Sequence, residues 1–154
     1  MRIDIGTAPG APVGFDFYVD IVPAPDVPAD KMIVADLNHR WPFSDEQVVF
    51  VRAFDIIEHL RDQIHTMNEL WRVLKPGGIA DIAVPTTEGP GAFKDPTHRS
   101  FWTRLSFNYY EKGHPDRERF ARNYGIVAAF KILSEKTVRT PEGPRLEIVL
   151  QAVK

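Results

Sequence analysis

Three aspartates mark the first three apolar runs of the chain. Asp4 lies within residues 2–5, Asp20 closes the second run, and Asp36 follows the third. A carboxylate at the tip of a strand accepts hydrogen bonds from ribose hydroxyls, and its charge makes each bond roughly twice as strong as a neutral one. Taken singly, such an aspartate is more often a loop cap. Three of them on successive strands favour a nucleotide-type binding site.

The segment between the first two runs is rich in glycine. Residues 6–14 contain three glycines and two prolines. Glycines let a backbone approach a ligand closely, although a tight turn between strands is an equally good interpretation. The segment is also shorter than the crossover that parallel strands usually need. We therefore expect a loop where a first helix would normally stand.

Two further groups of residues have side chains suited to acid–base chemistry. Glu58 and His59 stand in the segment 54–60, and Asp95 and His98 stand in the segment 90–99. A neutral imidazole near pH 7 can remove a proton from a hydroxyl or an amine, and Asp95 could orient His98 for this. The alternatives are a salt link at Glu58 and His59, and a rigid turn capped by Asp95.

Four possible metal ligands lie close together in the sequence: Asp55, Glu58, His59 and His65. His65 falls on a predicted helix and His59 before it, so their spacing does not enforce a shared site. There is no cysteine to supply a thiolate ligand. We therefore expect no metal site.

These motifs together resemble the class I S-adenosylmethionine-dependent methyltransferases, as a small type 11-like member with a truncated N-terminus. The resemblance covers about residues 2–107. It is carried by Ile3-Asp4-Ile5-Gly6-Thr7-Ala8-Pro9-Gly10, by Phe54-Asp55-Ile56-Ile57-Glu58-His59-Leu60, and by Arg72-Val73-Leu74-Lys75-Pro76-Gly77-Gly78. The chain departs from the family pattern at Ala8, which stands in place of the middle glycine.

The resemblance implies a role for each matching residue, with S-adenosyl-L-methionine as the cofactor. The expected cofactor-binding residues are Asp4, Gly6, Thr7, Ala8, Gly10, Asp20, Ile21, Asp36, Leu37, Ala53 and Phe54. Within this set, Asp20 would bind the ribose, Asp36 and the Leu37 backbone would bind adenine, and Ala53 and Phe54 would line both. The expected catalytic residues are Glu58, His59, Asp95 and His98.

The elements that must position these residues follow an α/β order. Strands are predicted at 2–5, 15–21, 31–35, 48–53 and 79–84, with a helix at 61–74 begun by Asp62. In that helix Gln63, Thr66, Glu69 and Arg72 are expected to face water. Two last strands, 126–138 and 145–153, suit an antiparallel hairpin. We predict one Rossmann-like domain over 1–154, with a mostly parallel seven-stranded sheet and an irregular segment 86–123 as a lid on the substrate side.

Composition limits the possible partners. The chain has 154 residues, no cysteine and a formal net charge of −2. This charge supplies no general attraction for nucleic acid or for an anionic membrane. With no apolar leader and no run long enough to span a bilayer, the expected location is the cytoplasm. An uncovered apolar sheet face, left by the missing first helix, makes a homo-oligomer an expectation.

The expected function is methyl transfer from S-adenosyl-L-methionine to a small-molecule acceptor. One alternative is a methyltransferase-like module that has lost turnover and serves in binding or assembly. The loop in place of the first helix and Ala8 favour it. A second alternative is an NAD-dependent reductase, which the glycine turn and Asp20 would suit. Ligand preference separates the three hypotheses.

Overall fold

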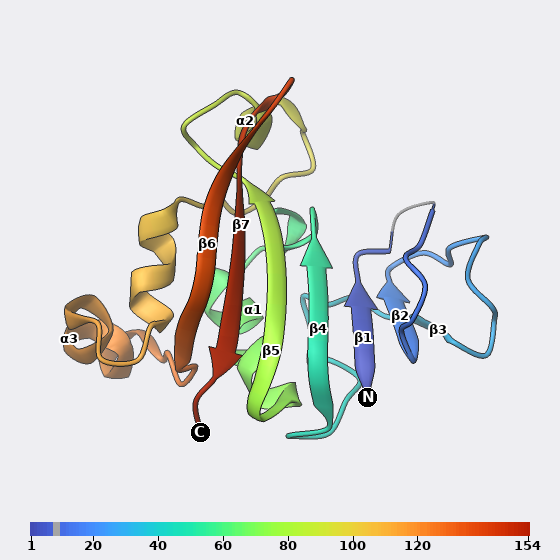
Figure 1. The fold of residues 1–154 in the computed structure, drawn as a ribbon, viewed down its shortest axis with the longest axis horizontal. Coiled ribbons are helices and arrows are strands. Elements are labelled where there is room, and N and C mark those ends of the chain that lie inside the picture. The colour runs from blue at the N-terminus through green and yellow to red at the C-terminus, as the bar shows by residue number, and fades with distance from the viewer. Residues whose placement is uncertain (8–9) are drawn as a thin grey trace.

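The computed structural model describes residues 1–7 and 10–154, and it contains one seven-stranded sheet (Figure 1). The strand order is β3-β2-β1-β4-β5-β7-β6. Only β7 runs antiparallel to its neighbours, β5 and β6. The predicted α/β fold with a terminal hairpin is thus confirmed. The strands are β1 (Arg2–Ile5), β2 (Phe17–Asp20), β3 (Met32–Val34), β4 (Val48–Phe54), β5 (Leu74–Pro85), β6 (Phe130–Thr140) and β7 (Gly143–Ala152).

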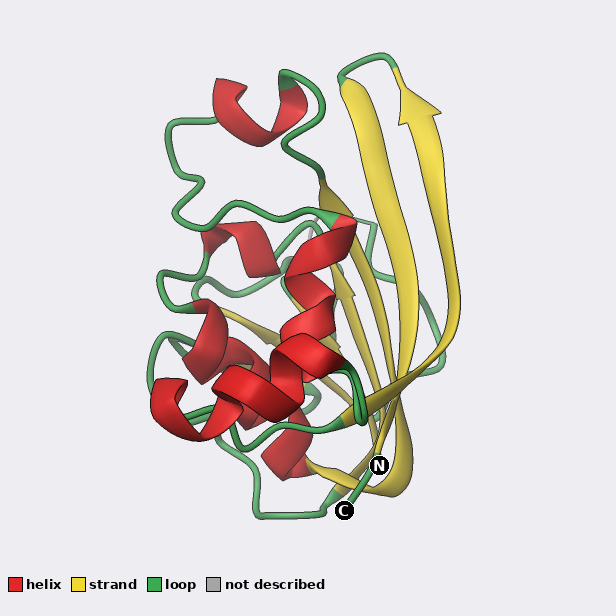
Figure 2. Cartoon of the chain, turned by 90° about the vertical axis from the view of Figure 1, so that its left-hand side faces the viewer, coloured by secondary structure: helices red, strands yellow, loops and turns green. Residues whose placement is uncertain are grey.

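The helices lie together on one side of this sheet (Figure 2). They are η1 (Ile57–His59), α1 (Gln63–Val73), α2 (Gly91–Lys94), η2 (Arg104–Tyr110) and α3 (Pro115–Tyr124). Between β1 and β2 the described residues form no helix, as the glycines and prolines there predicted. On the other side, loop residues Phe15, Ala24 and Val27 pack against Tyr18 of β2. The sheet therefore has one helical layer and, opposite it, a partial cover of loops.

The α1 helix forms where its sequence predicts. The Asp62 carboxylate accepts hydrogen bonds from the backbone N–H groups of Ile64 and His65, at 2.8 and 3.0 Å, and so begins the helix. The prediction was wrong for two positions expected to face water, because Thr66 and Glu69 are buried. Glu69 is satisfied in the interior by Arg72 and by a backbone N–H group. Helical spacing alone did not reveal these partners.

Alternation along the strands gives the sheet two different faces. Ile3, Ile5 and Val51 point to the helical side and are fully buried in the core. The opposite face carries charged and aromatic side chains: Arg52 donates to Asp4 at 2.9 Å and stacks 4.0 Å from the centre of the Phe54 ring. This face is therefore not the apolar surface that we expected the missing helix to leave.

The segment 86–123 folds against the end of the β6–β7 hairpin. A β-bridge joins Thr86 to Trp102, and Thr103 begins η2. Gly89 lies so close to the hairpin turn that an added Cβ would meet the Pro144 Cδ at 2.4 Å. The hairpin turn and this segment thus form one wall above the carboxyl end of the sheet. In the described part of the chain, no helix has the length and apolarity needed to cross a membrane.

Candidate functional site

Two cavities open at the carboxyl end of the parallel strands, and His59 lines both of them. The smaller cavity, about 110 Å³, is lined by Asp20, Ile21, Asp36, Leu37 and Ile56 among others. The larger cavity, about 470 Å³, is lined by Asp55, Glu58, Lys94, Asp95, His98 and the hairpin turn 140–145. Ligands of open α/β sheets bind at this edge. The position of the cavities therefore agrees with the general rule for such folds.

The smaller cavity brings two of the predicted acids together. Asp20 ends β2 and accepts a hydrogen bond from the Val22 N–H at 3.1 Å. Asp36 follows β3 and accepts from the Asn38 backbone at 2.9 Å and from its side-chain amide at 2.8 Å. These two bonds hold the pKa of Asp36 below its usual value. Both acids thus also act as turn formers, while their side chains border the cavity.

Four other described residues that were predicted to bind the cofactor line neither cavity: Asp4, Gly6, Thr7 and Gly10. Asp4 is fully buried, pairs with Arg52 and accepts from the Thr7 hydroxyl at 3.1 Å. Burial raises the pKa of Asp4 despite this ion pair. Gly6 packs behind the smaller cavity, and the Gly10 N–H donates to Asp26 at 3.0 Å. Ala8, which was also predicted to bind the cofactor, lies outside the described residues.

Ala53 and Phe54 also lie away from the smaller cavity. Ala53 is completely buried in the core, and Phe54 stacks with Arg52 and Arg145 on the opposite face of the sheet. Ile56 lines the cavity in their place. The chain turns there through Asp55, whose φ is +52°. Sequence reasoning missed Ile56 because period-two alternation does not continue through such a turn.

Glu58 is the most perturbed carboxyl group of the larger cavity. Its side chain is buried, and its Oε2 atom has no hydrogen-bond partner among the described residues. Burial raises the pKa of Glu58 to about 8, and the nearby Asp55 and Asp95 carboxylates add to the rise. Its backbone carbonyl accepts from the N–H groups of Arg99 and Ser100, at 2.7 and 3.0 Å. Glu58 is therefore fixed against the segment that carries His98.

Hydrogen bonds determine which ring nitrogen carries the proton in His59 and in His98. His98 Nδ1 lies 2.8 Å from the Ala92 carbonyl, so Nδ1 carries the proton and Nε2 holds the lone pair. The Thr97 hydroxyl donates to Asp95 at 2.6 Å, so its oxygen accepts from His59 Nδ1 at 3.0 Å. His59 thus also keeps its lone pair on Nε2. Asp95 lies 4.0 Å from His98, so the Ala92 carbonyl orients that ring instead.

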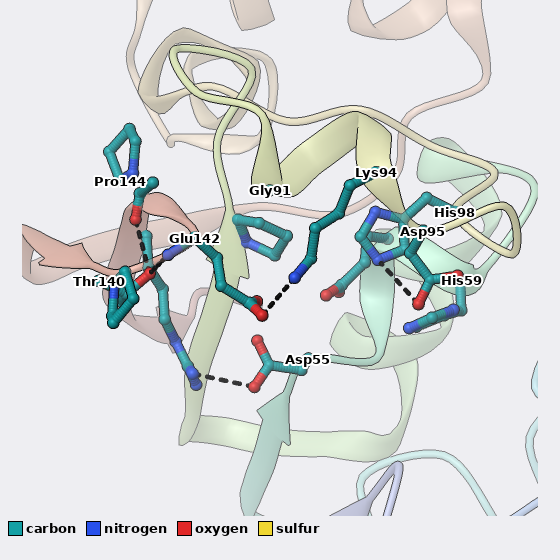
Figure 3. Close-up of a pocket in the computed structure, with 14 residues that line it drawn as sticks. Asp55, His59, Gly91, Lys94, Asp95, His98, Thr140, Glu142 and Pro144 are labelled. Atoms are coloured by element: carbon teal, nitrogen blue, oxygen red, sulfur yellow. Dashed lines mark hydrogen bonds and ion pairs between the residues drawn. The ribbon is translucent and has the colours of Figure 1, made fainter.

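Two basic residues in the larger cavity were missed by sequence reasoning. Arg145 pairs with Asp55 at 2.9 Å, and Lys94 pairs with Glu142 of the hairpin turn. Figure 3 shows Lys94 and Glu142 pointing toward one another beside Asp55, with His59 and His98 across the cavity. No signal in the sequence joins Lys94 to a hairpin some 50 residues later. Only the packing of the hairpin over α2 brings these residues together.

The comparisons with known proteins concern the same region. Residues 18–82 match the family model described as a methyltransferase domain. A protein of Mycolicibacterium smegmatis named "Probable S-adenosylmethionine-dependent methyltransferase" is 40% identical over 75 residues. This match covers 45% of the present chain and only 28% of the relative, so the chain spans less than a third of that protein.

Solved structures share the fold over nearly the whole chain. A complex of the Haloferax volcanii activator Trm112 with a methyltransferase matches with a TM-score of 0.69 and 19% identity, covering 99% of this chain and 82% of that chain. A Burkholderia thailandensis 1,6-didemethyltoxoflavin-N1-methyltransferase, whose structure holds S-adenosylhomocysteine, matches with a TM-score of 0.67 and 13% identity, covering 99% and 71%. At such identities the structures show the fold alone. Residues 18–82 are therefore similar to a methyltransferase domain, and the chain shares its fold with solved methyltransferases.

Proposed function

We propose that this chain transfers a methyl group from S-adenosyl-L-methionine to a small-molecule acceptor. The observation that carries the proposal is the meeting of two cavities at His59. The smaller cavity is bordered by two carboxylates at successive strand ends, and the larger one by groups that can exchange protons. A donor site and an acceptor site must adjoin in this way for direct transfer between two bound molecules.

The smaller cavity fits the nucleoside part of the cofactor. In the proposal, Asp20 accepts hydrogen bonds from the ribose hydroxyls, and Asp36 lies at the adenine end beside the Leu37 backbone. The apolar side chains of Ile21 and Ile56 border the same space. Ligand sites usually enclose about 300–1,000 Å³, so a cavity of about 110 Å³ holds only part of the cofactor. The remainder would extend past His59.

The larger cavity would hold the acceptor under the segment 86–123. When bound, the cofactor supplies a methyl group on a sulfonium, which is already activated for displacement. The protein's tasks are then to position the acceptor and exclude water, and alignment of this kind is worth about 7–11 kcal/mol. In this proposal His98 Nε2 takes the proton of an acceptor hydroxyl or amine. Glu58 and His59 shape the wall between the two sites.

Calorimetric titration with S-adenosylhomocysteine, S-adenosyl-L-methionine and NAD tests the cofactor assignment. We expect saturable binding of the first two ligands and none of NAD. Asp20→Ala removes charge-assisted hydrogen bonds worth about 1.5–3 kcal/mol, so binding should weaken roughly tenfold to hundredfold. Asp30→Ala is the control, because Asp30 is exposed and lies outside the smaller cavity.

Each result distinguishes the hypotheses. Binding of NAD alone would favour the reductase, and no binding of any of the three ligands would favour a module without turnover. Unchanged binding by Asp20→Ala would show that the ribose assignment is wrong. Where S-adenosylhomocysteine binds, the protein is next incubated with S-adenosyl-L-methionine and small phenols, amines or carboxylates. The compounds that cause S-adenosylhomocysteine to form identify the acceptor class. His98→Ala should then bind the cofactor normally and turn over more slowly.

A further inference from the structure

Glu58, His59 and His98 form a cluster with the donor set of a metal site. One possible ligand atom from each residue lies within 4.8 Å of the other two. The two imidazole rings meet edge to face, with centres 4.8 Å apart. Two imidazole nitrogens and one carboxylate oxygen are donors that divalent transition metals favour, whereas Mg²⁺ and Ca²⁺ prefer oxygen alone.

The hydrogen bonds around the histidines prepare them as ligands. The Ala92 carbonyl holds the proton of His98 on Nδ1, and Thr97 holds that of His59 on Nδ1. Each ring therefore keeps its lone pair on Nε2. A metal-binding histidine commonly donates its other N–H in this way to a carbonyl or another oxygen. Thr97 is itself fixed by the Asp95 carboxylate, so His59 has a supporting chain of two residues.

Glu58 lacks the partner that a buried carboxylate needs. Its side chain belongs to a residue only 2% exposed, and Oε2 accepts no hydrogen bond from the described residues. The two basic side chains that line the larger cavity are engaged elsewhere, Arg145 with Asp55 and Lys94 with Glu142. Because a buried polar atom without a partner is costly, a cation that binds at Oε2 and displaces the carboxyl proton would satisfy this group.

The backbone brings the three ligands together before any ion binds. Arg99 and Ser100 donate to the Glu58 carbonyl, and the Ser100 hydroxyl donates to the Ile57 carbonyl at 2.9 Å. At zinc–ligand distances of about 2.0–2.2 Å, tetrahedral ligand atoms lie roughly 3.4 Å apart. The ligand atoms lie within 4.8 Å of one another, so on binding an ion they would have to move closer by up to about 1.4 Å.

We propose that Glu58, His59 and His98 bind one divalent transition-metal ion of the Zn²⁺ or Co²⁺ type, with its open positions facing the larger cavity. From the sequence, no metal site was expected, because His59 and His65 are not held together by their spacing. In the fold, His59 lies beside His98 instead. This inference goes beyond methyl transfer and does not depend on it. In the ion-bound protein the lone pair of His98 is a ligand, so its role as a base belongs to the ion-free protein.

Titration of the metal-free chain of residues 1–154 with Co²⁺ tests the site, with binding followed by visible absorption and by calorimetry. We expect one Co²⁺ ion per chain, displaced by Zn²⁺ and unaffected by Mg²⁺. Glu58→Gln and His98→Asn should each weaken binding roughly tenfold or more, and Thr97→Val, which keeps all three ligands, should weaken it about tenfold. His39→Asn removes an exposed imidazole outside the cluster and should bind as the parent protein does.

The absence of saturable Co²⁺ and Zn²⁺ binding would overturn the proposal. So would binding that Glu58→Gln and His98→Asn leave unchanged. Circular dichroism of the metal-free variants separates the loss of a ligand from misfolding. If Glu58→Gln does not fold, Thr97→Val and His98→Asn decide the result. S-adenosylhomocysteine binding is measured separately on the same protein, so failure of the metal site and failure of the proposed function are distinguishable.

Discussion

Gly6 stands where the end of β1 meets Ile56 of the smaller cavity. Its φ is +73°, and an added Cβ would lie 2.4 Å from the Ile56 Cβ. Gly6→Ala should therefore lower the free energy of unfolding by about 1–2 kcal/mol, because alanine disfavours the left-handed backbone conformation. Overpacking against Ile56 should lower it by about 1–3 kcal/mol more. Displacement of Ile56 should also weaken S-adenosylhomocysteine binding. Denaturant unfolding and calorimetry measure the two effects.

Gly10→Ala is the matched control for this substitution. Gly10 has a φ of +86°, but apart from its chain neighbours no described residue has an atom within 4 Å of its added Cβ. Gly10→Ala should therefore lose the stability that the left-handed backbone costs, but not the further stability that overpacking costs. Equal losses of stability in the two variants would contradict the role given to the contact between Gly6 and Ile56.

The buried carboxylate of Glu69 should make the stability of the folded state depend on pH. Burial alone would raise the pKa of Glu69, but hydrogen bonds from Arg72 and the Trp41 N–H outweigh it and lower the pKa. A lowered pKa means that the stabilisation is present above the ordinary value of about 4.3 and is lost as the pH falls through the folded-state value. Glu69→Gln should lower the free energy of unfolding by about 1–3 kcal/mol at neutral pH. The difference in this free energy between the variant and the parent protein should become smaller in acid.

Urea unfolding from neutral to acidic pH measures this gap. Glu147→Gln is the control, because Glu147 pairs with the exposed Lys136 and such a surface pair contributes at most about 1 kcal/mol. A gap of constant size at every pH would mean that the charge of Glu69 is not what stabilises the folded state.

Single residues also show how far the sequence could predict the site. Asp20 and Asp36 were placed correctly at strand ends, because each follows an apolar run. Asp4 was expected to reach the cofactor, yet it lies between Ile3 and Ile5. Since these two neighbours point into the core, alternation turns Asp4 to the opposite face, where Arg52 meets it. Its partner stands 48 residues away and has no local signal.

At the scale of elements, the contact between Gly89 and the β6–β7 hairpin is open to test. An added side chain at Gly89 would meet the Pro144 Cδ at 2.4 Å and the Gly143 Cα at 3.2 Å. Gly89→Val should push the segment 86–100 off the hairpin, at a cost of about 1–3 kcal/mol. Hydrogen exchange should become faster in that segment, and acceptor turnover should fall. S-adenosylhomocysteine binding should change little, because the smaller cavity lies elsewhere.

Glu88→Ala is the control for this element, since its side chain is exposed on the same turn. Faster exchange in both variants would assign the effect to the turn itself. Unchanged exchange in Gly89→Val would show that the segment does not depend on the hairpin for its position.

The regular elements were more predictable than their junctions. The helical repeat and Asp62 placed α1 within two residues of its observed ends, and short apolar runs placed β1 and β4. The start of β5 was missed, because the glycines and proline of 75–78 indicate a helix stop but not that the strand begins at once. The segment 86–123 has no period to analyse, since its fold depends on the hairpin that follows it.

The whole molecule is a sheet with helices on one side, and its other face is unusual in being charged and aromatic. Arg2 stacks 4.4 Å from the centre of the Phe50 ring, and Arg52 pairs with Asp4. Lys136 and Glu147 form a further pair on the hairpin. These contacts let the face remain stable in water without a second helical layer. Because the face is charged, self-association through it would depend on contacts between charges and not on burial of an apolar surface.

Self-association remains a prediction, and this face gives it a salt dependence. In a two-fold symmetric pair, basic side chains of one copy can face acidic side chains of the other. Such contacts between exposed charges weaken as salt screens them. We expect sedimentation velocity to show a mass that rises with protein concentration at low salt and returns to one chain at high salt. Arg2→Glu should abolish this rise, whereas Arg122→Glu, on the exposed side of α3, should not. The mass of a single chain at every concentration and salt would show that the face functions as an ordinary solvent surface, because its arginines are already satisfied by their own aromatic and acidic neighbours.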